Sequence, residues 1–124
     1  MDYYIEQMIN GEEHGKGKLY KKNHNIIYEG EFAFGKFEGF GRFNKDNNDH
    51  YEGYFNNGLF DGKGKYFKEN KIIYEGDFKF DLFHGEGRLN YKDGAFYIGQ
   101  SSNGVRHGYG ILLDENKIIY EGEF

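Results

Sequence analysis

Residues 51–73 read YEGYFNNGLFDGKGKYFKENKII, and this stretch is one copy of a unit that recurs along almost the whole chain. The tyrosine that opens the unit returns every 23 residues, each time followed two residues later by glycine. These opening residues are Tyr28, Tyr51, Tyr74, Tyr97 and Tyr120. A self-similar period of this length is typical of repeat proteins, in which each unit packs on its neighbours.

Glycine marks the same places in successive units. Counting the opening tyrosine as position 1, glycine recurs at positions 3, 8, 12 and 14. These four positions hold 19 of the 20 glycines, and only Gly94 lies outside them. Asp81 is the one replacement at position 8 in the complete units. The glycines therefore belong to the architecture of the repeat and do not form a linker.

The pattern YEGxFxxGxxxGxG, followed by a polar turn, resembles the MORN repeat (membrane occupation and recognition nexus). The resemblance covers nearly the whole chain, because five units match in phase, although Glu6 and Met8 depart from it in the first. The family's usual tryptophan at position 5 is replaced by Phe32, Phe55, Phe78 and Phe124. The resemblance implies an elongated single sheet that recognises lipid or protein partners. It also implies that some relatives carry kinase or methyltransferase domains.

The units follow one another without a linker or a shift in composition. They span residues 4–27, 28–50, 51–73, 74–96 and 97–119, with a half unit at 120–124. We therefore expect one domain, residues 1–124. The sequence has no cysteine for a disulfide framework and no apolar stretch long enough to cross a bilayer. We expect a cytoplasmic protein, with the inner face of a membrane and the cytoskeleton as sites to examine.

Each unit is predicted to form a β-hairpin of an all-β, elongated, single-layer antiparallel sheet. Positions 1–5 alternate aromatic and charged residues, which indicates a half-buried strand. Asn-Gly pairs at 10–11, 57–58 and 103–104 place glycine where a tight turn needs positive φ. Pairing position 2 with position 15 joins opposite charges, as in Glu52–Lys65, and also joins Ile98 to Ile111. Ile5 with Lys18 is the one poor pair of this register.

This register divides the sheet into an aromatic face and a charged face. Positions 1, 5, 7, 10 and 16 are predicted to share the aromatic face with the glycines at 3, 12 and 14. The rings would lie over bare backbone and the sheet would curl into a trough. Position 7 contributes Phe34 and Phe80. The predicted partner-binding groove consists of Phe32, Phe37, Tyr51, Phe55, Phe60, Tyr74, Phe78, Phe83 and Tyr97.

Part of this groove is expected to remain uncovered. A single sheet has no second layer to bury its apolar face. We expect Phe37, Phe60 and Phe83, which lie near the turns, to be partly exposed, and Phe60 at mid-array to be a hot spot for binding. An exposed apolar strip of this kind marks an interaction site.

The sequence shows no constellation of catalytic or metal-binding residues. His14, His84 and His107 recur at position 11, but neighbouring units lie about 10 Å apart, too far to share one zinc ion. The carboxylates recur opposite cations, which favours a solvated charge ladder over an acid pair. We therefore expect no metal, no cofactor and no enzymatic activity. The net charge of −5 argues against nucleic-acid binding.

Three functions remain open from the sequence. We favour a protein-interaction scaffold whose trough takes an apolar helix or peptide of a partner. The second is a weak contact with a phospholipid surface, supported only by the basic column of Lys18, Arg42, Lys65 and Arg88. The third is an accessory module of a larger enzyme, which the resemblance implies.

Residues 120–124 repeat the first strand of a unit without a return strand after it. We expect this strand to pair backwards with the preceding return strand and to leave its outer edge unpaired. Tyr120 and Phe124 mark this edge. Our expectation is a homodimer joined through it or a longer parent array.

Overall fold

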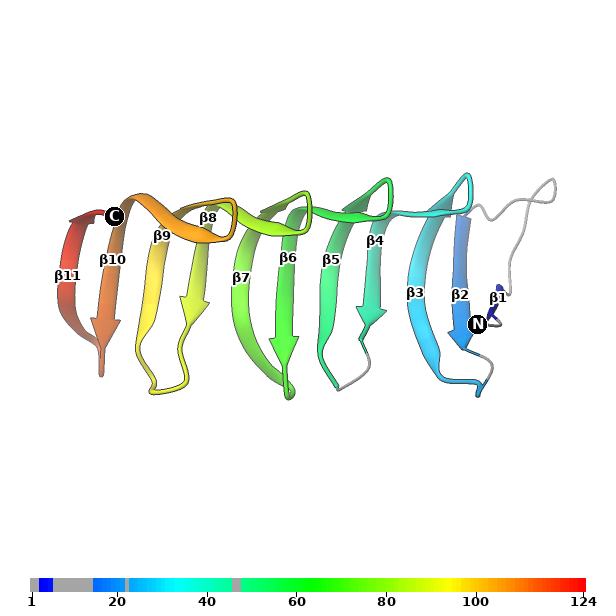
Figure 1. The fold of residues 1–124 in the computed structure, drawn as a ribbon, viewed down its shortest axis with the longest axis horizontal. Helices are drawn as coiled ribbons and strands as arrows, with labels where there is room; N and C mark the ends of the chain where they lie inside the picture. The colour runs from blue at the N-terminus through cyan, green and yellow to red at the C-terminus, as the bar shows by residue number, and fades with distance from the viewer. Residues whose placement is uncertain (1–2, 6–14, 22, 46–47) are drawn as a thin grey trace.

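A computed structural model describes residues 3–5, 15–21, 23–45 and 48–124, and the regular structure in these ranges is β-strand throughout (Figure 1). Eleven strands form one antiparallel sheet in which each strand pairs with its neighbours in chain order. The strands lie side by side along the long axis of the molecule, with the termini towards opposite ends (Figure 1). The predicted single-layer array of hairpins is confirmed. The strands are β1 (Tyr3–Ile5), β2 (Gly15–Lys21), β3 (Ile26–Ala33), β4 (Lys36–Asn44), β5 (His50–Asn56), β6 (Leu59–Lys68), β7 (Lys71–Lys79), β8 (Leu82–Asn90), β9 (Phe96–Ser102), β10 (Val105–Asp114) and β11 (Lys117–Glu123).

The pairing within the hairpins follows the predicted register. Glu52 lies opposite Lys65, and Ile98 lies opposite Ile111. The return strand of the preceding unit pairs in the same way, so that Arg42 faces Glu52 from the other side. Acidic and basic residues therefore alternate across the strands on the charged face, as cross-strand pairs prefer.

The first hairpin departs from this register. Ile5 lies opposite Leu19, so the predicted pair with Lys18 is wrong. The pairing is shifted by one residue relative to the later hairpins. The predicted turn at Asn10-Gly11 lies outside the described residues.

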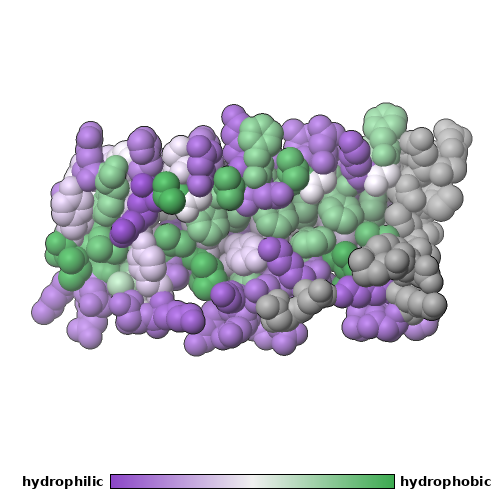
Figure 2. Space-filling view, in the orientation of Figure 1, coloured by the Kyte–Doolittle hydropathy of each residue, from purple (hydrophilic) through white to green (hydrophobic). Residues whose placement is uncertain are grey.

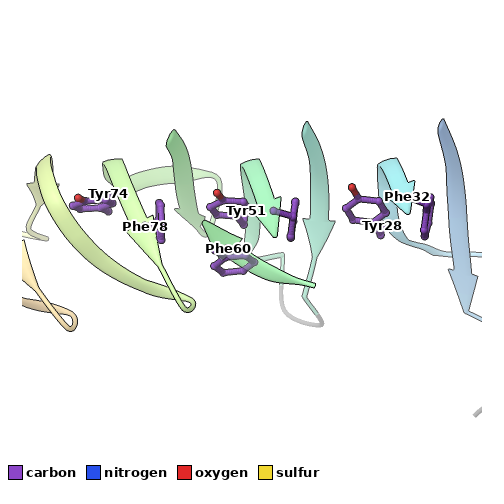
Figure 3. Close-up of a cluster of buried hydrophobic side chains, with 7 residues drawn as sticks. Tyr28, Phe32, Tyr51, Phe60, Tyr74 and Phe78 are labelled. Atoms are coloured by element: carbon purple, nitrogen blue, oxygen red, sulfur yellow. The ribbon is translucent and has the colours of Figure 1, made fainter. Parts of the chain in front are cut away.

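From the second unit onward, the opening tyrosine packs over glycine. Figure 3 shows Tyr28, Tyr51 and Tyr74 among the buried phenylalanines. A Cβ atom at Gly64 would fall within the ring of Tyr51, so only glycine leaves room for that ring. Phe60 lies parallel to Tyr51, with ring centroids 3.9 Å apart. Phe78 of the next unit meets the same ring edge-on at 4.9 Å. Tyr28 and Tyr51 each contact rings of their own and of the next unit, so the ring packing runs without a break from the second unit to the fourth. Tyr74 contacts Phe78 and Phe83 of its own unit, and position 5 of the fifth unit is Ser101 in place of a ring.

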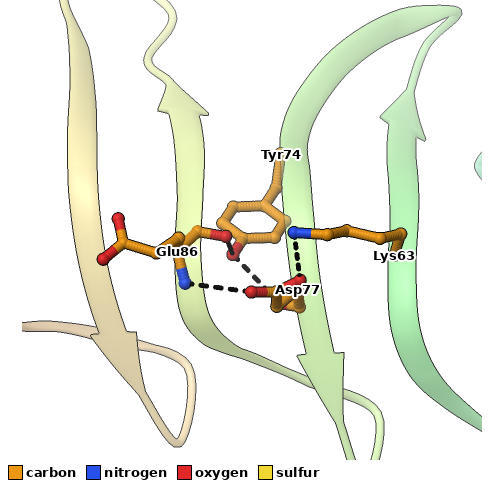
Figure 4. Close-up of polar contacts among 4 residues, drawn as sticks. All are labelled: Lys63, Tyr74, Asp77 and Glu86. Carbon is orange, nitrogen blue, oxygen red and sulfur yellow. Dashed lines mark hydrogen bonds and ion pairs between the residues drawn. The ribbon is translucent and has the colours of Figure 1, made fainter.

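The hydroxyl of the opening tyrosine satisfies a backbone carbonyl. The hairpin register shifts between positions 3 and 5, as between Gly76 and Phe78, so position 4 has no partner in its own hairpin. Tyr74 donates its hydroxyl hydrogen bond to the carbonyl of Asp77 at 3.0 Å (Figure 4). The Asp77 carboxylate accepts a bond from the Glu86 N–H at 3.2 Å and pairs with Lys63 at 2.6 Å (Figure 4). The bond from the Tyr74 hydroxyl to the Asp77 carbonyl explains why position 1 is tyrosine rather than phenylalanine, because an unpaired buried carbonyl is costly.

The hairpin turns fall at positions 7 and 8. Asn57 and Gly58 have φ angles of 52° and 83°, as the Asn-Gly turn predicts. Phe34 and Phe80 stand at the same turn position and are 76% and 65% exposed. The prediction that these two rings lie in the trough is wrong. Strand alternation ends where the turn begins, and both rings stay outside the buried core.

Contrary to the prediction, the glycine at position 12 does not lie beneath a ring of the aromatic face. A Cβ atom at Gly62 would meet the Cβ of Tyr54 at 3.5 Å, and Tyr54 belongs to the charged face. The φ of Gly62 is 90°, a left-handed conformation that most residues avoid. This glycine therefore serves the bulge in the return strand and does not make room for a ring.

Hydrogen bonds join the hairpin tips of successive units. The Gly58 N–H donates to the Phe37 carbonyl at 2.9 Å, and the Gly104 N–H donates to the Phe83 carbonyl at 2.9 Å. In Figure 1 these tips bend over along one long edge of the sheet. The row of tips forms one wall of the trough.

The last strand is ordered against β10, as predicted. Leu112 lies opposite Tyr120, and the Phe124 N–H donates to the Gly108 carbonyl at 2.8 Å. Phe124 packs edge-on against Tyr97, with centroids 4.8 Å apart. Phe124 therefore continues the aromatic core, whereas Tyr120 is 45% exposed.

Candidate functional site: an apolar groove

An apolar band runs along the sheet, across the strands (Figure 2). Hydrophilic side chains border it on both long edges in this view (Figure 2). In the described residues no second layer of structure covers the band, since the strands form one sheet. Apolar surface without such a layer is the first place to look for a partner.

The predicted groove residues divide into a floor and a wall. The floor is buried: in the units from residue 28 to residue 119 the tyrosines of position 1 are at most 1% exposed, and the phenylalanines of position 5 are 4% exposed. These floor residues are Phe32, Tyr51, Phe55, Tyr74, Phe78 and Tyr97. Phe37 and Phe83 are half-buried and form part of the wall, as expected.

Phe60 belongs to the floor. It is 7% exposed, so the prediction that it stays partly exposed is wrong. Its ring lies on Tyr51 and also contacts Phe55 and Phe78 edge-on, at 5.6 Å and 5.9 Å. Truncating Phe60 would therefore disturb the core before it disturbed a surface contact.

A groove of about 470 Å³ lies in the middle of the band. Its sides are formed by Phe37 and Phe83 and by Phe43 and Tyr66. The first two belong to position 10, whose phenylalanines we call the ring column, and the other two belong to position 16. Leu82, 44% exposed, stands at its rim. A concave, mostly apolar site of this size accommodates several apolar side chains of a partner.

Two charged residues of the groove were missed in the sequence. Lys45 stands at position 18, which period-two alternation places on the aromatic face, and its Nζ lies 5.1 Å from the centre of the Tyr66 ring. Asp81, noted only as the exception to glycine, accepts a hydrogen bond from the Phe60 N–H at 2.8 Å. The Asp81 N–H donates in return to the Phe60 carbonyl at 3.2 Å. This reciprocal pair fixes one hairpin tip to the preceding unit.

A second hollow of about 420 Å³ continues the groove towards the C-terminal end. Leu89, Tyr91, Val105 and Arg106 line it. Gly104 borders both hollows, so they lie next to each other. The surface offered to a partner thus extends from the second to the fifth unit.

The opposite face carries the predicted charges. Lys65 and Glu75 lie 3.9 Å apart, and both remain about half exposed. Exposed rings interrupt this face: Phe40 and Tyr54 meet edge-on at 5.4 Å and are 48% and 49% exposed, and Tyr109, at the same position as Phe40, is 53% exposed. Because most of its ions alternate in sign, this face presents little net potential to a partner.

The histidines show no arrangement suited to metal binding within the described ranges, where no group of three potential ligands comes together. His84 is half-buried, His107 is exposed, and His14 lies outside the described residues. His50 is buried and stacked on Phe67 with centroids 4.2 Å apart, and this burial lowers its pKa. The described part of the chain also contains no helix long and apolar enough to cross a membrane.

Comparison of the chain with sequence models of protein families shows the family to which it belongs. A sequence model of the MORN repeat matches residues 7–26, 28–50, 51–71, 74–96 and 97–117. The chain belongs to the MORN-repeat family. A comparison with curated proteins finds no match. MORN repeats are scaffolds that are not typically catalytic and that serve as protein- and membrane-interaction modules.

Proposed function

We propose that this MORN-repeat protein is a non-catalytic scaffold that binds an apolar helix or peptide of a protein partner in its groove. The observation that carries the proposal is the uncovered hollow of about 470 Å³ along an otherwise buried aromatic core. Half-buried rings and an exposed leucine, Leu82, would contact the partner there. Interfaces of this kind bury large apolar anchors at their centre and keep a polar rim.

The wall of the groove, and not its floor, supplies the partner contacts. The tyrosines and the position 5 phenylalanines are already covered by the fold, so they gain little further burial on binding. Phe37, Phe83 and Leu82 keep accessible surface and lie on both sides of the hollow. Apolar area removed from water contributes about 25 cal/mol per Å². We therefore assign the binding energy to these wall residues.

A pull-down from a native extract tests this assignment with two matched variants. Leu82→Asp places a carboxylate at the groove rim, whereas Phe80→Asp makes the same change of charge at a hairpin tip outside the groove. Both residues are exposed, so neither change removes a core ring. We expect the wild-type protein and Phe80→Asp to retain the same protein and Leu82→Asp to lose it. Equal retention by all three proteins would contradict the groove as the binding site.

Phospholipid recognition is the alternative function, and it needs a separate measurement of binding to lipid vesicles. The basic column of position 15 faces acidic residues on both sides, as Glu52 lies between Arg42 and Lys65. Neutralised cations attract an anionic lipid surface weakly. We expect the protein to remain in the supernatant with phosphatidylserine vesicles at physiological salt. Co-sedimentation that is unaffected by Leu82→Asp would favour the lipid function.

We further propose that a second copy pairs with the outer edge of β11. Ile118 and Ile119 are 58% and 60% exposed there, beside the half-exposed Tyr120. An apolar strand edge of this kind is a template for strand pairing between chains. Sedimentation at several protein concentrations measures whether the protein forms this dimer. The variant Ile118→Lys, which places a charge at the proposed edge, should remain a monomer. A monomer at every concentration would contradict the dimer.

The location that we propose is the cytoplasm. The absence of cysteine from the chain is compatible with a reducing compartment. Imaging of a tagged protein, with and without Leu82→Asp, measures whether the groove directs it to a membrane or to the cytoskeleton. A purely extracellular signal would contradict the proposed location.

A further inference from the structure

The ring column of position 10 ends in a cation. Phe37, Phe60 and Phe83 each lie parallel to the opening tyrosine of their unit. In the fifth unit the same position holds Arg106, beside Tyr97. The aromatic wall of the groove therefore changes to a guanidinium at its C-terminal end.

Three rings hold this guanidinium. Its central carbon lies 5.1 Å from the centre of Phe124, 5.8 Å from Tyr91 and 5.9 Å from Tyr97. These distances are within the range of cation–π contacts. Across the described ranges no carboxylate lies within 4.0 Å of the group. Arg106 is nevertheless exposed and lines the second hollow, so its planar donors remain accessible to an anion.

A second cation stands at the other end of the groove. Lys45 lies over the ring of Tyr66, and among the described residues no carboxylate pairs with it. Asp81 is the carboxylate that lines the groove, and its side chain is bonded to the Phe60 N–H. The two cations thus border an apolar floor.

We propose that the partner of the groove is an acidic, apolar peptide segment whose carboxylate pairs with Arg106 while its apolar side chains fill the hollow beside Phe83. This inference rests on the proposed function and names the chemistry of the partner. The match is one of charge, because a guanidinium and a carboxylate form paired, charge-assisted hydrogen bonds. Leu89 and Val105 line the same hollow and would contact the aliphatic part of the partner.

The geometry also fixes the spacing in the partner. Phe83 and Arg106 hold the same position in adjacent units, two strands apart, which corresponds to about 10 Å. A helix covers that distance in about seven residues, and an extended strand covers it in about three. The carboxylate should therefore follow or precede the apolar anchor by one of these two intervals.

Selection of random peptides displayed on phage tests the proposal. The library is selected in parallel on the wild-type protein, on Arg106→Phe and on Lys79→Gln. Arg106→Phe restores the residue type of the column and so should fold. Lys79→Gln removes a cation at a hairpin tip, where Lys79 contacts the exposed ring of Phe80.

On the wild-type protein and on Lys79→Gln we expect large apolar residues together with Asp or Glu at one fixed interval. On Arg106→Phe we expect the apolar residues without the acidic one. In fluorescence anisotropy, replacing that acidic residue by its amide should weaken binding to the wild-type protein roughly ten-fold and leave binding to Arg106→Phe unchanged.

The failures of the two proposals are distinguishable. Apolar peptides that bind the wild-type protein, lose binding in Leu82→Asp and show no preference for an acidic residue would overturn this inference and leave the groove as the binding site. Absence of any enriched peptide sensitive to Leu82→Asp would overturn both proposals. Phosphatidylserine-containing vesicles that bind the wild-type protein but not Arg106→Phe, without enriched peptides, would assign Arg106 to a lipid headgroup and overturn the peptide.

Discussion

The ring of Phe60 lies flat on the ring of Tyr51, with centroids 3.9 Å apart and an interplanar angle of 7°. The same contact joins Phe37 to Tyr28 and Phe83 to Tyr74, at 3.9 Å and 4.1 Å. Each position 10 phenylalanine therefore covers the tyrosine of its own unit. This contact decides which mutations act on the fold and which act on the groove.

Replacement of Phe60 by alanine should reduce the stability of the protein. The ring is buried and contacts Tyr51, Phe55 and Phe78, so its loss removes core packing. We expect a decrease of about 3–5 kcal/mol in the free energy of unfolding, measured by urea denaturation. Phe80→Ala, at an exposed tip, should change it by less than about 0.5 kcal/mol. Equal effects of the two substitutions would mean that Phe60 is not part of the core.

Replacement of Tyr51 by phenylalanine isolates the hydroxyl. That hydroxyl donates to the Tyr54 carbonyl at 2.7 Å, and the ring remains in place in the variant. The partly buried carbonyl would lose its partner, so we expect a loss of about 1–3 kcal/mol in unfolding free energy. Tyr66→Phe is the control, because Tyr66 is half-buried and its ring is retained. A Tyr51→Phe protein as stable as the wild type would show that the bulge does not need this bond.

The two glycines of one return strand should respond differently to the same substitution. At Gly64 a side chain would collide with the ring of Tyr51, whereas at Gly62 the new Cβ would make an ordinary contact with Tyr54. Asparagine tolerates positive φ better than most residues. We therefore expect Gly64→Asn to cost about 1–3 kcal/mol and Gly62→Asn about 1 kcal/mol or less. Thermal and urea unfolding of the two proteins measure the difference, and the reverse order would contradict the assigned faces.

The buried tyrosines predict loss of stability at alkaline pH. Burial raises the pKa values of Tyr28 and Tyr51, and it raises that of Tyr74 to about 12. In the unfolded chain these groups titrate at about 10. Between the tyrosine pKa of the unfolded chain and that of the folded protein, the folded state therefore binds more protons than the unfolded state. The stabilisation that the neutral buried tyrosines contribute is present below pH 10 and is lost as the pH rises towards the folded pKa.

This alkaline transition can be followed by the absorbance of tyrosinate and by circular dichroism. We expect tyrosines on the surface to ionise first, and the buried ones to ionise together with unfolding. Ionisation of all tyrosines at their ordinary pKa, with the sheet intact, would contradict their burial.

Much of the fold was predictable because the same position can be compared between the units of the repeat. The pairs Glu52–Lys65 and Ile98–Ile111 vary together between units, and this fixed the hairpin register. The errors arose where strand alternation stops. Phe34 and Phe80 lie in turns and Gly62 lies in a bulge, and at such residues counting by twos does not determine the direction of a side chain.

The groove was predicted less completely than the fold. The rings were found because they recur, but their burial depends on how the hairpin tips bend and join, as in the bond from Gly58 to Phe37. Period two alone does not determine that bend, and so Phe60 was expected to be partly exposed. Asp81 and Arg106 are exceptions within their columns, and a search for recurring residues passes over them.

The most direct test of the groove is a methyl nuclear magnetic resonance titration of the protein with the partner retained in the pull-down. Leu82 and Leu89 report on the groove and its C-terminal extension, and Ile98 and Ile111 report on the opposite face. We predict that the leucine methyl signals shift in proportion to bound partner while the isoleucine signals stay in place. Shifts confined to Ile98 and Ile111 would contradict the groove as the site where this protein binds its partner.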